Sequence, residues 1–515
     1  MKKILIAFLI MCMLPSLFVS TAFAGDKPKA LADKKFDEKN IVLRFAAISD
    51  THMQSPNWIP SQKLSKALEQ LNARADGKLD AVFISGDITD YGLPEQAAEL
   101  KRVFDHSSID LDKTRLVFAI GNHEYYGHQL QKLPWKGGFL FRDVFGDQAY
   151  KGASDEEIMA ANYHAVVNGY DFIAVNCDQY DGGVKYKESD LSWLKKQLDE
   201  AVKNHPGKPV FVASHPNIVG TNLGSNDGDF WAGKDLYYVL KDYPEVIFFC
   251  GHLHYSEADE RNIWQGEFTT IGLGSTYYLS NHNKEDLSGE NIIELSGGFE
   301  TSDYLETPGQ GVYAEVDKNN NVRLTKIDFT HRKDIKSPWL VPAPKKDKSH
   351  LLYYTPEQLK ATFGKAAPVF PKGSVVKEIS KVHGNYQYQF TQAKDNDMVY
   401  CYQVSFVEKA SGKTLKTIYT LSDFYLYANP SEMAPALTKS VPKADSLLAP
   451  FNTNYAKDYY IQVVAVDCFG QKSAPIKSET IKGSGMGNSQ GMIMNDCKKS
   501  GGASCSNTEL CEETE

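Results

Sequence analysis

The stretch from Ile41 to His52 reads Ile-Val-Leu-Arg-Phe-Ala-Ala-Ile-Ser-Asp-Thr-His, an apolar run that ends on an aspartate and a histidine. Short continuous apolar runs rich in Val, Ile and Phe are typical of buried strands. Four similar runs follow, and each leads directly to a polar residue. They cover residues 79–86, 114–121, 208–215 and 245–251, and they lead to Asp87, Asn122, His215 and His252.

Helix-like segments separate these runs. They cover residues 61–75, 94–104, 189–203 and 234–240. Alternation of strands and helices indicates a layered α/β core. In open α/β folds, ligands bind beyond the carboxyl ends of the strands. The polar residues that follow the runs are therefore expected to meet at one rim of the sheet.

Five short motifs, in chain order, supply candidate metal ligands. Each alone occurs by chance in many chains, and a single buried Asp or His is more often a hydrogen-bonded core residue than a ligand. Five in sequence, each closing an apolar run, favour a metal site. Mixed carboxylate, amide and imidazole ligands suit Mn, Fe or Zn. The motifs are Asp50-Thr-His52, Gly86-Asp87-Ile-Thr-Asp90, Gly121-Asn122-His123-Glu124, His215 and Gly251-His252-Leu-His254.

These ligand types point to phosphoester chemistry. Two cations roughly 3.5–4 Å apart neutralise the phosphoryl oxygens and generate hydroxide near neutral pH. One carboxylate must lie between the ions, and Asp87 is the candidate because Gly86 lets the backbone turn tightly before it. His123 is not needed as a ligand and is the natural proton donor to the leaving group. No further cofactor is expected.

This order of motifs resembles the calcineurin-like metallophosphoesterase superfamily over about residues 41–329. The resemblance implies a four-layer α/β/β/α sandwich with the metals at the strand ends, His123 as general acid and a metal-bridging hydroxide as nucleophile. It also implies two ligand sets that share one aspartate. The first metal would be held by Asp50, His52, Asp87 and His254, and the second by Asp87, Asn122, His215 and His252.

Differences from the motifs of other branches narrow the choice of branch within this superfamily. Asp90 stands where the purple acid phosphatases carry a tyrosine, so a tyrosine-ligated ferric ion is not expected. Residues 125–127 are Tyr-Tyr-Gly where the protein Ser/Thr phosphatases carry an arginine. Residues 47–53 and 86–90 look most like the bacterial branch that includes class III cyclic nucleotide phosphodiesterases. That branch also contains phosphomonoesterases and phospholipid-directed enzymes, which leaves the substrate open.

The amino terminus predicts export. A basic start at Lys2 and Lys3, an apolar stretch over residues 4–18 and the small residues Ala22 and Ala24 are typical of a secretory signal peptide over residues 1–24. The remaining protein is then expected in the periplasm or outside the cell. No other run is long enough for an integral membrane span.

The charge balance limits the partners. A formal net charge of −9 argues against nucleic acid as the main partner. It is compatible with a small phosphorylated substrate, a nucleotide among the candidates, because bound metals supply local positive charge.

The length of 515 residues predicts more than one domain. A metallophosphoesterase domain is expected over residues 41–335, followed by a Pro- and Lys-rich linker or strap over 336–371 and a disordered tail over 484–515. Residues 372–483 have short strands and turns. The run Tyr459 to Gly470, with Tyr459, Ile461, Val463 and Ala465 on one face, resembles a fibronectin type III β-sandwich.

Two questions stay open in the sequence. The aromatic-rich insertion between Tyr125 and Tyr163 fits either a lid that stacks on a nucleobase or a small satellite core, and the loop from Asn217 to Trp231 is a second candidate substrate wall. The alternative to an enzyme is a non-catalytic surface or periplasmic binding protein. In that case the fibronectin-like domain would hold an unknown protein partner and the metal site would be vestigial.

Overall fold

The computed structural model describes residues 36–54, 56, 58–180, 183–226, 230–279, 308–382, 385–427, 435–442 and 457–482. The expected signal peptide and the expected disordered tail lie outside these ranges. Within them, no helix has the length and apolar character needed to cross a bilayer.

The first sheet of the larger domain carries three of the predicted motifs. Its strands β1, β2 and β3 run parallel, and β12 lies antiparallel on the other side of β1. The order across the sheet is β14-β13-β12-β1-β2-β3, with β15 also paired to β13. The strands are β1 (Ile41–Ile48), β2 (Ala81–Ser85), β3 (Arg115–Ala119), β12 (Gln310–Asp317), β13 (Val322–Asp328), β14 (Lys333–Asp334) and β15 (Trp339–Val341).

The second sheet carries the other two motifs. Its order is β10-β11-β9-β6-β5-β4, with parallel pairing from β11 through β5 and antiparallel edge strands. The strands are β4 (Tyr163–Val167), β5 (Tyr170–Ala174), β6 (Val210–Ala213), β9 (Val246–Cys250), β10 (Ile263–Gln265) and β11 (Thr269–Gly272). A short parallel pair, β7 (Asn217–Ile218) and β8 (Ala232–Gly233), lies beyond β6.

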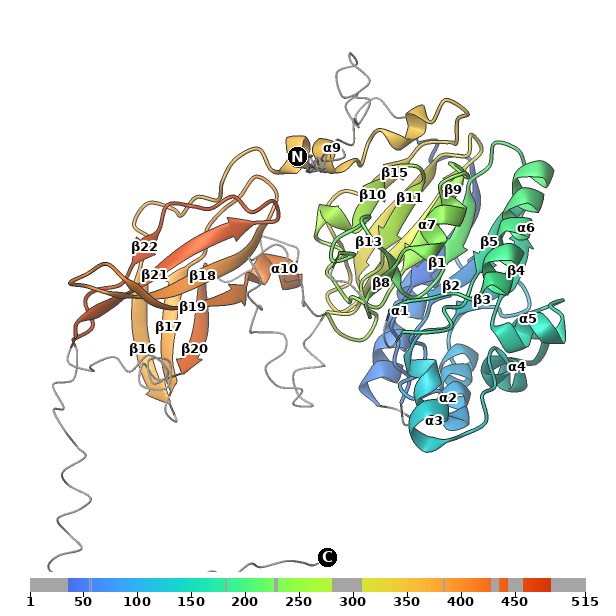
Figure 1. Ribbon diagram of the computed structural model, residues 1–515, viewed down its shortest axis with the longest axis horizontal. Coiled ribbons are helices and arrows are strands. Elements are labelled where there is room, and N and C mark those ends of the chain that lie inside the picture. The colour runs from blue at the N-terminus through green and yellow to red at the C-terminus, as the bar shows by residue number, and fades with distance from the viewer. Residues whose placement is uncertain are drawn as a thin grey trace, which may run out of the picture.

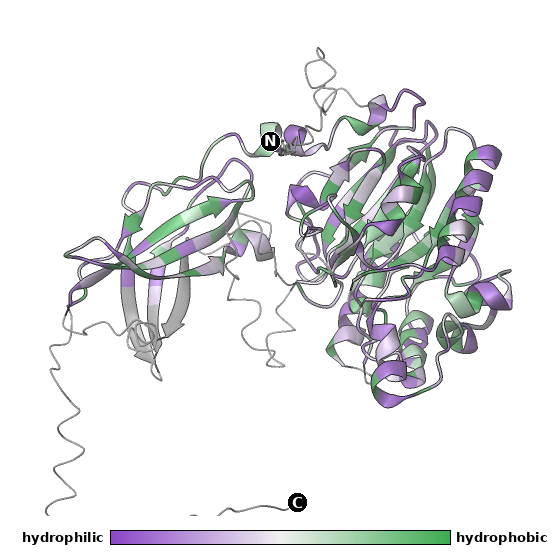
Figure 2. Ribbon diagram, in the orientation of Figure 1, coloured by the Kyte–Doolittle hydropathy of each residue, from purple (hydrophilic) through white to green (hydrophobic). Residues whose placement is uncertain are grey.

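The two sheets face each other across an aromatic core. The ring of Phe45 in β1 lies 4.6 Å from that of Phe211 and 5.0 Å from that of Phe172 in the second sheet. Helices cover the outer faces, which confirms the predicted four-layer sandwich (Figure 1). Hydrophobic residues concentrate in the strands and hydrophilic residues along the helices (Figure 2). The covering helices are α1 (Ile59–Arg74), α2 (Pro94–Asp105), α6 (Glu188–Asn204) and α7 (Asp235–Leu240).

The insertion after β3 packs onto the sandwich through its own aromatic core. The ring of Phe118 in β3 lies 5.3 Å from Phe141 and 5.6 Å from Phe145, both in α4. Tyr125 stacks on Trp135 at 4.2 Å. Most of these rings therefore form a satellite core rather than a lid. The insertion contains α3 (His123–Gln131), α4 (Phe139–Phe145) and α5 (Asp155–Ala160).

Part of the segment expected as a linker or strap is tied to the first domain. Trp339 in β15 is buried, and its indole Nε1 donates a hydrogen bond to Glu260 Oε2 at 2.6 Å. Since β15 pairs with β13, this stretch extends the sheet. Helix α9 (Pro356–Phe363) follows it.

The C-terminal region is a two-sheet β domain. One sheet has the order β16-β17-β20 and the other β19-β18-β21-β22. Tyr459, Ile461, Val463 and Ala465 are buried, as the alternation in this run predicts. The resemblance to fibronectin type III domains stays a prediction. The elements are β16 (Val376–Val382), β17 (Asn385–Thr391), β18 (Val399–Glu408), β19 (Thr414–Leu421), α10 (Asp423–Tyr427), β20 (Ala436–Pro442), β21 (Tyr459–Asp467) and β22 (Ile476–Lys477).

Candidate metal centre

The side chains predicted from the sequence come together where the carboxyl ends of the parallel strands of both sheets meet. Asp50 and His52 follow β1, Asp87 follows β2, and Asn122 and His123 follow β3. His215 follows β6, and His252 and His254 follow β9. Apart from His123, these side chains are buried. The position agrees with the rim at which open α/β folds bind ligands.

The backbone at this rim is strained. Five of these residues adopt a positive φ, which costs an L-residue roughly 1–2 kcal/mol each. Such strain persists where the surrounding structure enforces it, and it clusters at functional sites. The residues and angles are Asp50 (54°), His52 (43°), Asp87 (45°), His252 (73°) and His254 (54°).

Two glycines let the motifs approach each other. Gly86 has a φ of 88°, and a Cβ there would lie 2.6 Å from the His215 ring. A Cβ on Gly251 would lie 2.5 Å from Asp50 Oδ2. Any side chain at these positions would therefore push a candidate ligand away.

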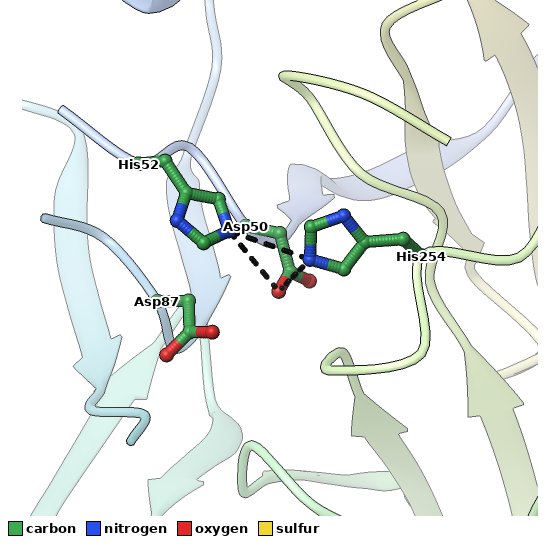
Figure 3. Close-up of side chains that lie close together, drawn as sticks. All are labelled: Asp50, His52, Asp87 and His254. Atoms are coloured by element: carbon green, nitrogen blue, oxygen red, sulfur yellow. Dashed lines mark hydrogen bonds and ion pairs between the residues drawn. The ribbon is translucent and has the colours of Figure 1, made fainter. Parts of the chain in front are cut away.

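The first cluster consists of Asp50, His52, Asp87 and His254, whose ligand atoms all lie within 4.8 Å of one another. The Nε2 atom of His254 lies 2.9 Å from Asp50 Oδ1 and 3.3 Å from His52 Nε2. Figure 3 shows the two imidazoles and the Asp50 carboxylate converging on one point, with Asp87 beside them.

The second cluster consists of Asp87, His215 and His252 and therefore shares Asp87 with the first. His215 Nε2 lies 3.0 Å from Asp87 Oδ2 and 3.1 Å from His252 Nδ1. The amide of Asn122 donates through Nδ2 to the Tyr126 hydroxyl at 3.0 Å, while its Oδ1 is buried and has no hydrogen-bond partner among the described residues. A buried carbonyl oxygen without a hydrogen-bond partner is able to bind a cation.

Each imidazole is fixed in orientation through its other nitrogen. His215 donates to the Ser85 carbonyl at 2.7 Å, and His254 donates to the Tyr278 carbonyl at 2.9 Å. His252 donates through Nε2 to the Phe230 carbonyl at 3.2 Å, and His52 Nδ1 lies 3.3 Å from Asp90 Oδ1. Metal-binding histidines use such bonds to fix the tautomer that presents the free nitrogen to the ion.

The electrostatics of the cluster follow from burial and from the close packing of opposite charges. Burial opposes ionisation of Asp50, but the charges of His254 and His215 outweigh it and hold the pKa of Asp50 at about 2. Burial also opposes protonation of His215, yet Asp87 and Asp50 raise its pKa to about 9. Burial, together with the neighbouring His215 charge, lowers the pKa of His252 to about 3. The carboxylates of Asp50 and Asp87 therefore make this rim a place that attracts positive charge.

Asp90, which the sequence marks only as a departure from another family, contacts two histidines of the centre. Its carboxylate faces His52, and its backbone carbonyl accepts a hydrogen bond from His123 Nδ1 at 2.8 Å. Burial opposes protonation of His123, but Asp87 and Asp90 raise its pKa to about 10. The signal in the sequence was the position of Asp90, three residues after Asp87 in the same motif.

Glu124 joins two of the motifs. Its Oε1 accepts from the Thr89 amide at 2.7 Å, and its Oε2 accepts from the Gly121 amide at 2.7 Å. The loops that carry Asp87 and Asn122 are therefore held together by one buried carboxylate. This explains structurally why Glu124 follows Asn122 and His123.

The donor set fits divalent metal ions. It combines carboxylate and amide oxygens with imidazole nitrogens, and it contains facing nitrogen lone pairs and an unpartnered amide oxygen. Such a set suits Mn, Fe or Zn.

Comparison with known families agrees with this geometry. The profile described as calcineurin-like phosphoesterase matches residues 43–256. This part of the chain belongs to the calcineurin-like metallophosphoesterase superfamily. A "Probable cyclic nucleotide phosphodiesterase" from Rhodococcus erythropolis is 24% identical over 229 residues, which cover 41% of this chain and 64% of the relative. The chain thus spans less than two thirds of that relative's length.

The similar solved structures have low TM-scores. A glycoside hydrolase domain of Endo-D from Streptococcus pneumoniae R6 has a TM-score of 0.14 and 14% identity, covering 33% of this chain and 24% of its own. A chitinase from Bacillus thuringiensis has a TM-score of 0.15 and 11% identity, covering 76% and 68%. Both scores are too low to relate the folds.

Proposed function

We propose that this metallophosphoesterase is a dinuclear-metal-dependent hydrolase of phosphoric esters. The observation that carries the proposal is the shared carboxylate: Asp87 belongs to both clusters of candidate ligands. Asp50, His52 and His254 complete one set, and His215, His252 and Asn122 complete the other. Divalent ions held in these sets would neutralise the phosphoryl oxygens and supply the attacking nucleophile.

His123 is placed to act as the general acid. Its backbone amide donates to Asp87 Oδ1 at 3.0 Å, and its Nδ1 donates to the Asp90 carbonyl. These two bonds leave Nε2 as the ring nitrogen available to a substrate. The side chain is 24% exposed, unlike the buried ligands. A protonated Nε2 can pass its proton to the oxygen of the leaving group.

The charged groups around the candidate carboxylates favour a phosphodiester over a phosphomonoester as the substrate. In the described part of the chain, no lysine or arginine forms an ion pair with Asp50, Asp87 or Asp90, whose recorded charged partners are all histidines. A monoester dianion needs more positive charge than a diester monoanion. The name of the Rhodococcus relative supports the same choice.

Among the described residues, aromatic rings border the centre. The Tyr126 ring lies 4.6 Å from that of His123, and the Tyr278 ring lies 4.3 Å from that of His254. Trp231 lies 4.8 Å from His252 on another side. Such rings pack against flat or apolar ester groups. We therefore propose a small phosphodiester as substrate, with nucleotides among the candidates.

The test is a paired assay on full-length protein stripped of metal and reloaded with Mn. Bis-nitrophenyl phosphate would be compared with nitrophenyl phosphate, and 3′,5′-cyclic AMP with 5′-AMP. The proposal predicts metal-dependent turnover of the diesters that clearly exceeds turnover of the monoesters. Monoester preference would make the protein a phosphatase, and no turnover with Mn, Fe or Zn would favour the binding-protein alternative.

We also propose that the protein is exported. The support is the amino-terminal sequence alone, with its basic start, apolar stretch and small residues before position 25. Expression of the full chain in a bacterium, followed by fractionation and amino-terminal sequencing, tests it. A mature protein beginning near Gly25 in the periplasm or medium is expected, and an uncleaved protein in the cytoplasm would contradict it.

A further inference from the structure

We propose that Tyr425 of the C-terminal β domain is a positioning residue for the metal centre. It would act by holding the loop that carries His252 and His254. The inference rests on the metal centre of the proposed function, but its tests read metal binding and backbone protection rather than turnover. It assigns a role within the catalytic unit to a domain that the sequence associates only with an unknown partner.

A direct hydrogen bond links the β domain to the ligand loop. The backbone amide of Ser256 donates to the Tyr425 hydroxyl at 3.0 Å. Both residues are fully buried, and Ser256 lies two positions after His254. Because water has no access to this amide, the tyrosine hydroxyl satisfies a donor that would otherwise be left without a partner.

The ligand loop needs support from outside itself. His252 and His254 both have positive φ angles, of 73° and 54°. Non-glycine residues keep such angles only when surrounding contacts impose them. The catalytic domain contributes Gln310, whose Oε1 accepts from the Glu257 amide at 2.7 Å. The β domain contributes Tyr425 at the neighbouring residue.

The interface around Tyr425 holds that side chain in place. It is a buried apolar cluster drawn from both domains, and polar contacts flank it. The Arg261 guanidinium lies 5.3 Å from the centre of the Tyr400 ring, and Lys336 pairs with Asp397 at 2.7 Å. The cluster contains Ala258 and Ile335 from the catalytic side and Met398, Tyr400, Cys401, Tyr419, Leu421, Tyr425, Val466 and Cys468 from the β domain.

This arrangement differs from that of a module joined only by a linker. Domains with small polar contacts move relative to each other, whereas an apolar buried interface fixes their relative position. Figure 1 shows α10, which carries Tyr425, on the side of the β domain that faces the catalytic domain. The ligand loop can therefore be influenced by how well the two domains are docked.

The chain offers a matched control for a variant at Tyr425. Tyr402 is also fully buried, and its hydroxyl accepts from the Ala393 amide at 2.9 Å. Both Tyr402 and Ala393 lie inside the β domain. Tyr425→Phe and Tyr402→Phe thus each remove one hydroxyl acceptor from one buried amide, but only the first contact reaches the ligand loop.

The first test measures Mn binding to metal-stripped, full-length protein by calorimetry. Loss of a group that orients metal ligands typically weakens affinity by about 10-fold or more. Tyr425→Phe is expected to raise the apparent Kd for Mn about 10-fold, while Tyr402→Phe stays within about twofold of wild type, with both variants losing thermal stability. An unchanged Kd in Tyr425→Phe would overturn the proposal.

A second measurement needs no variant and therefore does not depend on one folding. If Tyr425 and the metal centre are coupled, metal binding must in turn stabilise the segment around Tyr425. Hydrogen exchange of the wild-type protein should slow over residues 423–427 when Mn is added, but not over residues 385–391 in the far sheet of the β domain. Equal exchange at 423–427 with and without Mn would overturn the proposal, even if turnover is normal. Failure of turnover with both effects present would count against the proposed function only.

Discussion

The Nε2 atoms of His52 and His254 face each other at 3.3 Å. His254 donates through its other nitrogen to the Tyr278 carbonyl, and Nδ1 of His52 faces the Asp90 carboxylate. With those nitrogens protonated, both Nε2 atoms point lone pairs into the same space. Asp50 Oδ1 lies 2.9 Å from one of them. When both rings are neutral, a cation bound between the two nitrogens and the Asp50 carboxylate would replace the repulsion among three electron-pair donors, so metal binding would stabilise this arrangement.

Asp87→Ala is expected to remove metal binding and turnover together, because Asp87 belongs to both ligand clusters. Metal analysis after equilibration with Mn, alongside the diester assay, checks this. Asp171→Ala is the control, since Asp171 is a buried aspartate bonded to His164 and His205 away from the centre. Two tightly held ions in Asp87→Ala would contradict the assignment of Asp87 as the shared ligand.

His123→Ala is expected to keep its metals and lose roughly 10²–10⁴-fold in kcat on substrates with poor leaving groups. The loss should be smallest on nitrophenyl esters, since nitrophenolate leaves without a proton. A series of diesters with leaving groups of increasing pKa measures this dependence. An equal loss across the series would show that His123 is not the acid.

A graded pair of variants at Asp90 tests the role of its carboxylate in orienting His52, whose Nδ1 lies 3.3 Å from Asp90 Oδ1. Asp90→Asn keeps an oxygen that can accept from a ring nitrogen, whereas Asp90→Ala does not. We expect Asp90→Ala to weaken Mn binding by about 10-fold or more and Asp90→Asn to weaken it less. Titration of metal-stripped protein gives both values, and identical values for wild type and Asp90→Ala would exclude the role.

The stability of the catalytic domain should depend on pH through His164. Burial opposes its protonation, but hydrogen bonds to Asp171 and Gln197 outweigh burial and raise its pKa. A raised folded-state pKa adds stability that is fully present below the unfolded pKa of about 6.5 and is lost as the pH rises through the folded value. The Tm of wild type should therefore fall more than that of His164→Gln between pH 6 and pH 9. Parallel Tm curves would contradict this.

Local patterns explain how much of the fold could be predicted. The apolar runs before Asp87 and His215 are contiguous, so their strands and the positions of the residues after them follow from the sequence. Helix α1 was expected from residue 61 and begins at Ile59, because Pro60 is tolerated in the first turn of a helix. The four-layer sandwich could be predicted only from the family resemblance, since no local sequence pattern indicates that Phe45 packs against Phe211.

Long-range contacts account for what could not be predicted. The backbone carbonyls of Tyr278 and Phe230 orient His254 and His252. The sequence does not indicate which carbonyls do so, because every residue has one. The bond from Ser256 to Tyr425 joins residues 169 positions apart and depends on how two domains dock. The aromatic insertion was ambiguous because Phe141 and Tyr126 have similar side chains, yet only Tyr126 lies beside His123.

The central claim is that one carboxylate, Asp87, joins two metal sites. Electron paramagnetic resonance of the Mn-loaded protein, with Mn quantified per chain, tests it most directly. Two ions about 3.5–4 Å apart share ligands and couple magnetically. The account predicts two Mn per chain and an exchange-coupled spectrum that is lost in Asp87→Ala. A single ion, or two ions with uncoupled spectra, would contradict it.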